Sequence, residues 1–148
     1  MTAEPAINGD AALWHAGERA LQAQVGMRAR MEGRGAVVLR DQMPDQHRQF
    51  FVERNQLLLG VLDATGQPWA TMVEGDVGFI TSPTPKLLIV GAMPPAGDPG
   101  TDGLQHGAAI GILGIEFETR RRNRMNGIIR QVANGQEVLV EVTQSFGN

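Results

Sequence analysis

The chain has 148 residues, of which 42% are hydrophobic and 20% are charged, and its formal net charge at pH 7 is −3. These values are ordinary for a single globular domain, and the slight acidity argues against a general nucleic-acid-binding protein. The chain contains no cysteine, which excludes disulfides, zinc–thiolate sites, iron–sulfur ligation and cysteine nucleophiles.

The first third of the chain predicts helices. Asp10 is a candidate N-cap for a helix that would end near Gly26. Residues 31–36, MEGRGA, predict a turn, and residues 41–54 predict a short helix with Pro44 in its first turn. The buried side of that second helix is expected to carry Met43, His47, Phe50 and Phe51.

From residue 57 onward the pattern changes to six or seven strands. The strand segments begin with LLLGVLD (57–63), PWATMV (68–73), GFITS (78–82) and KLLIV (86–90), and continue with AAIGILGIEF (108–117), RRNRMNGIIRQV (121–132) and EVLVEV (137–142). Residues 91–103 predict a loop, because three prolines and four glycines disfavour a helix or a ladder. Asn134-Gly135 predicts a type I′ hairpin. The order favours a mainly β fold, an antiparallel barrel with N-terminal helices.

The chain offers little chemistry of its own. Neither a GxGxxG nor a GxxxxGK[ST] motif is present. His15, His47 and His106 have no metal-ligand spacing, so no metal site is expected, and the first two are interpreted as helix residues with satisfied hydrogen bonds. Ser82 and Ser145 lack the context of a nucleophile elbow. A cofactor must therefore carry any reaction.

No segment predicts a membrane partner or a secretory signal. The longest apolar run, residues 57–62, is far shorter than a bilayer span, and the first residues have no basic segment followed by an apolar run. We therefore expect a cytoplasmic protein.

The segment TRRRNRMNG, residues 119–127, holds four of the twelve arginines. Nucleic acid, a phosphate-bearing ligand, a carboxylate partner and a solvated face all remain open as explanations. Because side chains alternate along a strand, Arg121 would face one side, whereas Arg120, Arg122 and Arg124 would face the other. The four arginines therefore cannot all serve one ligand.

The order of these segments resembles the pyridoxamine 5′-phosphate oxidase-like family of FMN-binding split barrels, in particular its branch of flavin-nucleotide-binding proteins. The resemblance rests on GERALQ (17–22), MPDQHRQFF (43–51), LGVLDATGQPWATMVEGDVGFITSP (59–83), GILGIEFETRRRNRMNG (111–127) and QSFGN (144–148). It implies an antiparallel split β-barrel with N-terminal helices, in one domain over residues 1–148 with a helical extension over residues 1–30. It also implies FMN as the cofactor, bound between the two protomers of a homodimer.

The resemblance implies roles for nine residues. The strand that lies along the isoalloxazine would contribute Trp69, Ala70, Thr71 and Met72. The next strand and turn would bind the FMN phosphate through Thr81, Ser82 and Lys86. The Arg-x-x-Arg-x-x-Gly pattern of the oxidases is matched by Arg121, Arg124 and Gly127, and its spacing favours Arg121 on the ligand side. Core packing of Trp69 and an exposed position for Lys86 remain the structural alternatives.

The chain departs from the true oxidases, which have a basic residue at the position of Pro68 and a substrate-binding segment beyond the position of Asn148. Activity on pyridoxine phosphate is therefore not expected, and the catalytic residues are unknown. In the branch it resembles, QSFGN is followed by Cys-Pro and a further segment, which leaves truncation of this chain open.

Three functional hypotheses follow. The first is an FMN-dependent oxidoreductase that passes hydride or electrons to an unknown small molecule. The second is a non-enzymatic carrier or sensor of flavin, deazaflavin or a haem-related ligand. The third is a dimeric interaction domain without a cofactor. The residues do not distinguish the first hypothesis from the second, because a flavin site looks alike in an oxidoreductase and in a carrier.

Overall fold

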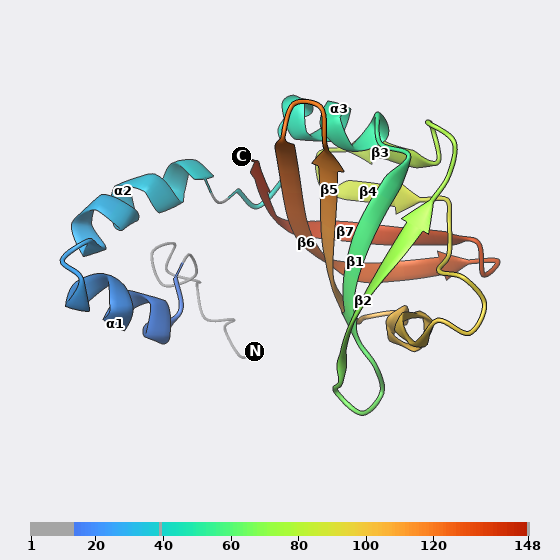
Figure 1. Cartoon of the computed structure of the whole chain (residues 1–148), viewed down its shortest axis with the longest axis horizontal. Helices are drawn as coiled ribbons and strands as arrows, with labels where there is room; N and C mark the ends of the chain where they lie inside the picture. Colours follow the sequence, from blue (N-terminus) through green and yellow to red (C-terminus); the bar gives the residue numbers. More distant parts are fainter. Residues whose placement is uncertain (1–13, 39, 148) are drawn as a thin grey trace, which may run out of the picture. The chain divides into compact units, whose positions relative to one another are not determined.

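The computed structural model describes residues 14–38 and 40–147. The chain divides into two compact units, Met1–Leu39 and Arg40–Asn148. The first unit contains α1 (Ala16–Gln24) and α2 (Arg28–Val38), shown in blue tones in Figure 1. The second unit contains α3, seven strands and a short 3₁₀ helix.

Helix α1 begins at Ala16 because His15 caps it. The His15 ring nitrogen Nδ1 accepts hydrogen bonds from the backbone N–H groups of Gly17 and Glu18, and the Glu18 carboxylate accepts one from the His15 backbone N–H. The predicted cap, Asp10, lies outside the described residues. The predicted end of the helix is confirmed, because the C-cap is Val25 and the next residue is glycine with a positive φ.

The prediction of a turn at residues 31–36 is wrong, because these residues lie within α2. An ion pair between Arg28 and Glu32, one helical turn apart, joins Nη2 to Oε1 at 2.8 Å. A Cβ at Gly33 would meet no atom within 4 Å. Packing therefore does not require glycine at this position. Glycine lowers the helix propensity here but does not break the helix.

The second unit is a mainly β structure that confirms the predicted fold class. Its strands are β1 (Gln56–Leu62), β2 (Pro68–Glu74), β3 (Ile80–Thr84), β4 (Leu87–Val90), β5 (Ala109–Glu116), β6 (Arg121–Ala133) and β7 (Glu137–Gly147). They form one antiparallel sheet in the order β2-β1-β5-β6-β7-β4-β3, which curves around a hydrophobic core (Figure 1). The order leaves β2 and β3 at its two ends.

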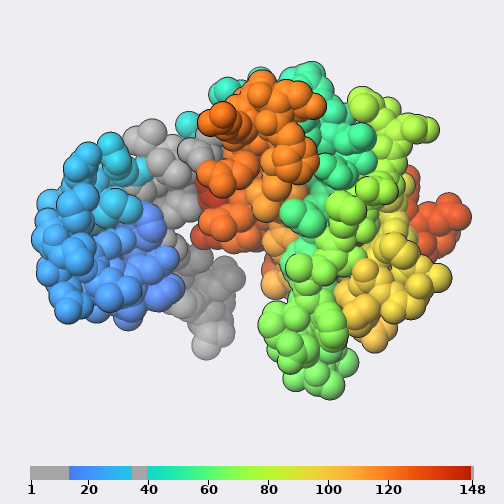
Figure 2. All heavy atoms as spheres, in the orientation of Figure 1, coloured from blue at the N-terminus to red at the C-terminus, as the bar shows by residue number. Residues whose placement is uncertain are grey.

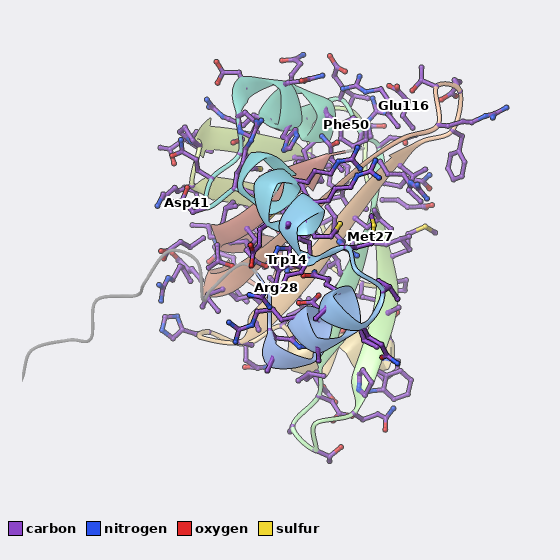
Figure 3. All side chains as sticks on the ribbon, turned by 90° about the vertical axis from the view of Figure 1, so that its left-hand side faces the viewer. Trp14, Met27, Arg28, Asp41, Phe50 and Glu116 are labelled. Carbon is purple, nitrogen blue, oxygen red and sulfur yellow. The ribbon has the colours of Figure 1, made fainter. Side chains whose placement is uncertain are left out.

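Helix α3 (Asp45–Val52) packs onto this barrel and lies within the predicted range 41–54, but Pro44 is its N-cap and not part of its first turn. Met43, Phe50 and Phe51 are at most 1% exposed. Phe50, labelled in Figure 3, approaches Gly114 of β5 so closely that a Cβ there would lie 2.8 Å from its Cε1. The side chains along each strand therefore alternate between two faces of the sheet. One face points toward α3 and the core, and the other points outward. We call these the inner and the outer face.

Two turns show how local sequence determines the connections. Asn134 and Gly135 both have positive φ, and the Gln136 N–H donates to the Ala133 carbonyl at 2.9 Å, which confirms the predicted type I′ hairpin. Arg120 has a φ of 60° and lies in the turn before β6, so it does not take part in the alternation predicted for it.

The predicted loop at residues 91–103 contains the 3₁₀ helix η1 (Pro99–Gly103), so the expectation of no helix there is wrong for its last five residues. The reason is a local cap: the Asp98 carboxylate accepts a hydrogen bond from the Gly100 N–H at 2.7 Å. None of the described helices is long and apolar enough to cross a membrane.

Candidate functional site

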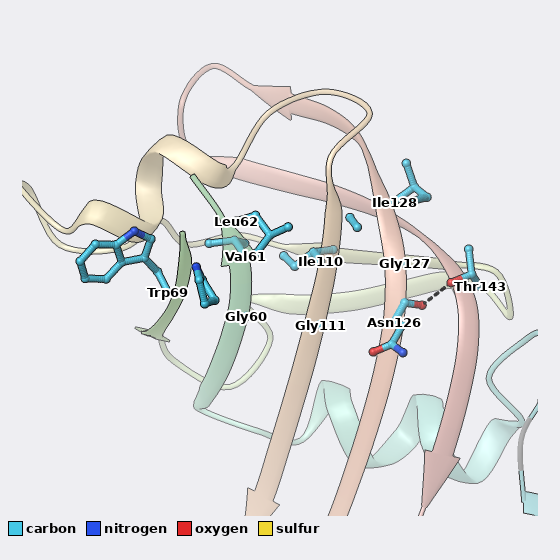
Figure 4. Close-up of a pocket in the computed structure, with 12 residues that line it drawn as sticks. Gly60, Val61, Leu62, Trp69, Ile110, Gly111, Asn126, Gly127, Ile128 and Thr143 are labelled. Atoms are coloured by element: carbon cyan, nitrogen blue, oxygen red, sulfur yellow. Dashed lines mark hydrogen bonds between the residues drawn. The ribbon is translucent and has the colours of Figure 1, made fainter. Parts of the chain in front are cut away.

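A groove of about 410 Å³ lies on the outer face of the barrel, across β1, β5, β6 and β7 (Figure 4). Its floor and walls include Gly60, Leu62, Gly111, Asn126, Ile128 and Thr143, and Pro68 and Trp69 of β2 line it as well. The lining is largely apolar, with a few polar groups. That composition and size are typical of small-molecule pockets.

The groove exists because glycines face one another across the strands. Gly60 of β1 pairs with Gly111 of β5, and Gly111 pairs with Asn126 of β6. A Cβ at Gly60 would have only the Gly111 carbonyl oxygen as a neighbour, at 3.9 Å, and one at Gly111 only Asn126 Oδ1, at 3.6 Å. The missing side chains therefore leave open space above the sheet and not a tight contact.

The polar groups of the groove are held by the neighbouring strands. The Asn126 amide Nδ2 donates to Gln144 Oε1 at 2.9 Å, and the Thr143 hydroxyl donates to the Asn126 carbonyl at 3.1 Å, the bond drawn in Figure 4. The register of β6 and β7 shifts between Asn126 and Gly127. This irregularity turns Thr143 toward the groove beside Asn126.

The Trp69 indole, which points away from Gly111 in Figure 4, is held by Asp63 in the β1–β2 turn. The Asp63 carboxylate accepts hydrogen bonds from the Thr65 hydroxyl at 2.7 Å and from the Trp69 indole at 2.9 Å, and from the backbone N–H groups of Thr65 and Gln67. The hydrogen bond from the Thr65 side chain, followed by that from Trp69, lowers the pKa of Asp63 well below its usual range. The hairpin that carries this turn, green in Figure 2, protrudes from the barrel.

The predicted isoalloxazine strand coincides with β2, and its residues divide between the two faces. Ala70 pairs with Gly60, and Met72 pairs with Leu58, all on the outer face. Thr71 is 4% exposed on the inner face. Its hydroxyl donates to the Asp98 carboxylate at 2.5 Å. Since β2 ends the sheet order, half of its backbone N–H and C=O groups point away from β1.

The three residues expected to bind the FMN phosphate lie elsewhere, at β3 and its turn. Arg48 of α3 donates to the Ser82 hydroxyl from Nε at 3.1 Å and to the Ser82 carbonyl from Nη2 at 2.5 Å. Lys86 forms an ion pair with Asp41 at 3.3 Å. Thr81 pairs with Ile89 of β4. None of these side chains lines the groove, so their phosphate-binding role stays a prediction.

The two arginines of the predicted motif face opposite sides, as the alternation predicts. The Arg121 guanidinium lies over the Phe50 ring, 5.3 Å from its centroid, which places it on the inner face beside α3. The Arg124 guanidinium lies 4.6 Å from the Phe146 ring centroid, and Arg124 is exposed two residues before Asn126. Arg124 thus shares the outer face with the groove, and Arg121 does not. The expectation that Arg121 is the ligand-side residue has no support from this geometry.

The histidines have separate surroundings. His15 caps α1, the His47 ring lies 2.7 Å from the Ser145 hydroxyl, and the His106 ring lies 2.6 Å from the Arg130 carbonyl. Among residues 14–38 and 40–147, no group of three or more His, Asp or Glu side chains could hold a metal ion.

Sequence reasoning missed the residues that shape the groove, above all Gly60, Gly111 and Asn126. The signal that could have found them is glycine at two strand positions that become neighbours once β1 and β5 are paired. That pairing was not available from local patterns.

Comparison with known proteins rests on structure, because no family model and no curated protein matches the sequence. A solved protein from Lactobacillus delbrueckii, described as a candidate pyridoxamine 5′-phosphate oxidase, aligns with 72% of this chain and 95% of its own, with a TM-score of 0.55 and 13% identity. The barrel therefore has the split-barrel fold of this solved protein.

A second solved split barrel is similar in the same way. HupZ from Group A Streptococcus aligns with 71% of this chain and 93% of its own, with a TM-score of 0.54 and 14% identity. At such identities the likeness establishes the fold alone, so the ligand and the activity must be argued from the residues of this chain.

Proposed function

We propose that the chain is a flavin-nucleotide-binding protein that holds FMN in the outer-face groove and acts as an oxidoreductase on a small molecule. The observation that carries the proposal is the glycine floor formed by Gly60 and Gly111, which leaves a flat apolar surface of the kind that a planar ring system needs. Bound FMN would supply the redox chemistry.

The residues of the chain would position that group and shield it. The backbone of Pro68 and Trp69 borders the groove, and the edge strand β2 would offer backbone hydrogen bonds to a ring with several polar atoms. Asn126 and Thr143 contribute the polar side chains in the groove. Arg124, on the same face, is placed to meet a phosphate, because its planar guanidinium matches phosphate oxygens and keeps its charge.

The same face also suggests a second copy of the chain. A shallow depression of about 100 Å³ beside the groove is lined by the apolar side chains Leu58, Met72, Leu113, Ile115 and Phe117. Phe117 is 68% exposed. Contiguous apolar surface of this kind marks interfaces. We therefore propose a cytoplasmic homodimer in which the partner protomer closes the groove.

The decisive experiment is the visible spectrum of the full chain purified from cells, together with the mass of any ligand released on denaturation. The proposal expects flavin absorption bands and the mass of FMN. A haem or deazaflavin mass would instead favour a carrier or sensor. Protein that is colourless and does not bind added FMN at micromolar concentration would contradict the proposal. Light scattering checks the homodimer, which a monomer mass would overturn.

A further inference from the structure

Three of the residues that line the outer-face groove have polar side chains: Trp69, Asn126 and Thr143. The Trp69 indole N–H already donates to the Asp63 carboxylate, at 2.9 Å, so it is not available to a ligand. The hydrogen-bonding character of the groove therefore depends on Asn126 of β6 and Thr143 of β7.

The Asn126 amide turns its oxygen toward the floor of the groove. A Cβ built on Gly111 would lie 3.6 Å from Asn126 Oδ1, whereas Asn126 Nδ2 donates to Gln144 Oε1 at 2.9 Å. Gly111 in β5 and Gln144 in β7 are the partners of Asn126 on its two sides. In Figure 4 the amide oxygen lies on the side of Gly111. The amide thus presents an acceptor to the groove and uses its nitrogen on the neighbouring strand.

The Thr143 hydroxyl is also an acceptor toward the groove. It donates its hydrogen to the Asn126 backbone carbonyl at 3.1 Å. A hydroxyl has a single hydrogen and two lone pairs, so once that hydrogen is engaged the oxygen can only accept. No described residue donates a hydrogen bond to Asn126 Oδ1 or to Thr143 Oγ1. Both oxygens are therefore open to a donor on a ligand.

A groove that offers acceptors selects a ligand that carries a donor. A ring without a donor would cover these oxygens and leave them unsatisfied, which weakens binding. The oxidised isoalloxazine ring has an N–H at N3, between two carbonyl groups, and a deazaflavin ring has the same imide edge. The polar groups at the periphery of a haem are carboxylates, which when ionised can only accept.

The rest of the lining also suits an uncharged ring edge. None of the side chains that line the groove is charged, and Leu62, Ala109 and Ile128 are apolar. An ionised group placed against them would lose its hydration without gaining a partner. An imide edge is neutral at pH 7 and avoids this cost, whereas a carboxylate does not.

We propose that Asn126 determines the ligand class of the groove by accepting a hydrogen bond from the ring N–H of a cyclic imide, the edge that flavins and deazaflavins share. Thr143 supplies a second acceptor beside it. Gln144 is a positioning residue, because its Oε1 holds the amide nitrogen and so directs Asn126 Oδ1 toward the groove. The inference rests on the proposed function, since it assigns one edge of the proposed flavin to one side chain.

The test compares FMN with its 3-methyl analogue in fluorescence titrations of the full chain. Methylation at N3 removes the hydrogen and keeps the ring, both carbonyls and the phosphate. The unmodified chain should bind FMN at least about tenfold more tightly than 3-methyl-FMN. Equal affinities would overturn this inference and leave the FMN proposal standing. Failure of both ligands to bind at micromolar concentration would overturn both.

Variants of Asn126 separate a hydrogen bond from a steric effect. Asn126→Leu is similar in size but has no acceptor, so its preference for FMN over 3-methyl-FMN should disappear. A preference that persists in Asn126→Leu would show that the groove excludes the methyl group by size, and would overturn the proposal. Asn126→Asp keeps an acceptor and should keep the preference, and its loss there would contradict the acceptor role.

The matched control is Asn55→Leu, the same change at an exposed residue outside the groove. It should bind both ligands as the unmodified chain does, and a lost preference in this variant would contradict a local effect of Asn126.

Two further ligands test the chemical class. The 5-deaza analogue of FMN keeps the imide edge and should bind with an affinity similar to that of FMN, whereas haemin should not displace FMN. Displacement of FMN by an equal concentration of haemin, or binding of the deaza analogue more than about tenfold weaker than that of FMN, would contradict the imide class. The mass of the ligand released from protein purified from cells then distinguishes a flavin from a deazaflavin.

Discussion

The outer and inner faces of the same sheet use glycine for opposite purposes. On the outer face, Gly60 and Gly111 leave empty space, with no atom closer than 3.6 Å to an added Cβ. On the inner face, a Cβ at Gly114 would collide with Phe50, and one at Gly127 would overlap the carbonyl of Glu141. A glycine in a strand can thus mark a binding surface or a tight contact, and only the pairing of strands separates the two cases.

The largest effect should come from the inner face. Phe50→Ala should lower the free energy of unfolding by about 3–5 kcal/mol, because the side chain is 1% exposed and its removal leaves a cavity between α3 and β5. Phe117→Ala, at an exposed site on the outer face, is the control; at a protein concentration at which light scattering gives a monomer, it should change the free energy of unfolding by less than about 0.5 kcal/mol. Urea unfolding measures both, and similar losses would contradict the assignment of the two faces.

The glycines themselves should differ by a smaller amount. Gly127→Ala should destabilise the barrel by about 1–3 kcal/mol, because the added methyl group meets the backbone of Glu141 and the side chain of Val140. Gly111→Ala should be neutral or stabilising by up to about 1 kcal/mol, since it restricts the unfolded chain without a clash. Equal urea midpoints for these two variants would show that the faces do not differ in packing.

Ligand affinity provides a further test of the outer face, through two of its arginines. Arg124→Gln, on the outer face, should weaken FMN binding roughly ten- to a hundredfold and riboflavin binding much less, because only FMN carries a phosphate. Arg122→Gln is the control, because Arg122 is exposed on the same face but lies two residues farther along the strand from Asn126 than Arg124 does. It should change both affinities little. Fluorescence titration separates them, and equal losses for FMN and riboflavin in Arg124→Gln would assign Arg124 a structural role.

The smallest effect should be the pH dependence of stability that His47 contributes. Burial, then the charge of Arg40, then that of Arg121, lower the pKa of His47, so the folded protein holds this proton more weakly than the unfolded chain, whose histidine pKa is about 6.5. The unfolded state therefore binds more protons below that pH, so the contribution is complete above pH 6.5 and is lost as the pH falls. The urea midpoint of the unmodified chain should fall more between pH 7.5 and 5.5 than that of His47→Gln. The same fall in both would exclude His47 as the cause.

The sequence predicted the barrel well because its signals are local. The alternation of β6 and the Asn134-Gly135 turn depend only on neighbouring residues, and both are confirmed. The α2 helix was missed because its glycines resemble a turn, whereas the stabilising Arg28–Glu32 pair appears only once a helix is formed. Local reasoning predicted strands but not the register between them.

The candidate site required that register. Trp69 and β2 were found from a resemblance, but the groove depends on the pairing of Gly60 in β1 with Gly111 in β5, two strands that are distant in the sequence. The face of Arg121 followed from alternation, yet which face carries the groove did not. Ser82 and Lys86 also acquire their partners, Arg48 and Asp41, only through the packing of α3 and the turn beside it.

The account depends most on the claim that the open space above Gly60 and Gly111 is the FMN site. Titration of FMN into Gly111→Val tests it directly, because valine would fill the groove while its Cβ meets only Asn126 Oδ1, at an ordinary contact distance of 3.6 Å. Gly33→Val, the same change at an open position of α2, is the matched control. We expect a folded Gly111→Val protein whose FMN affinity falls at least tenfold, roughly 1.4 kcal/mol, with the control unchanged. Full FMN affinity in folded Gly111→Val would contradict the central claim.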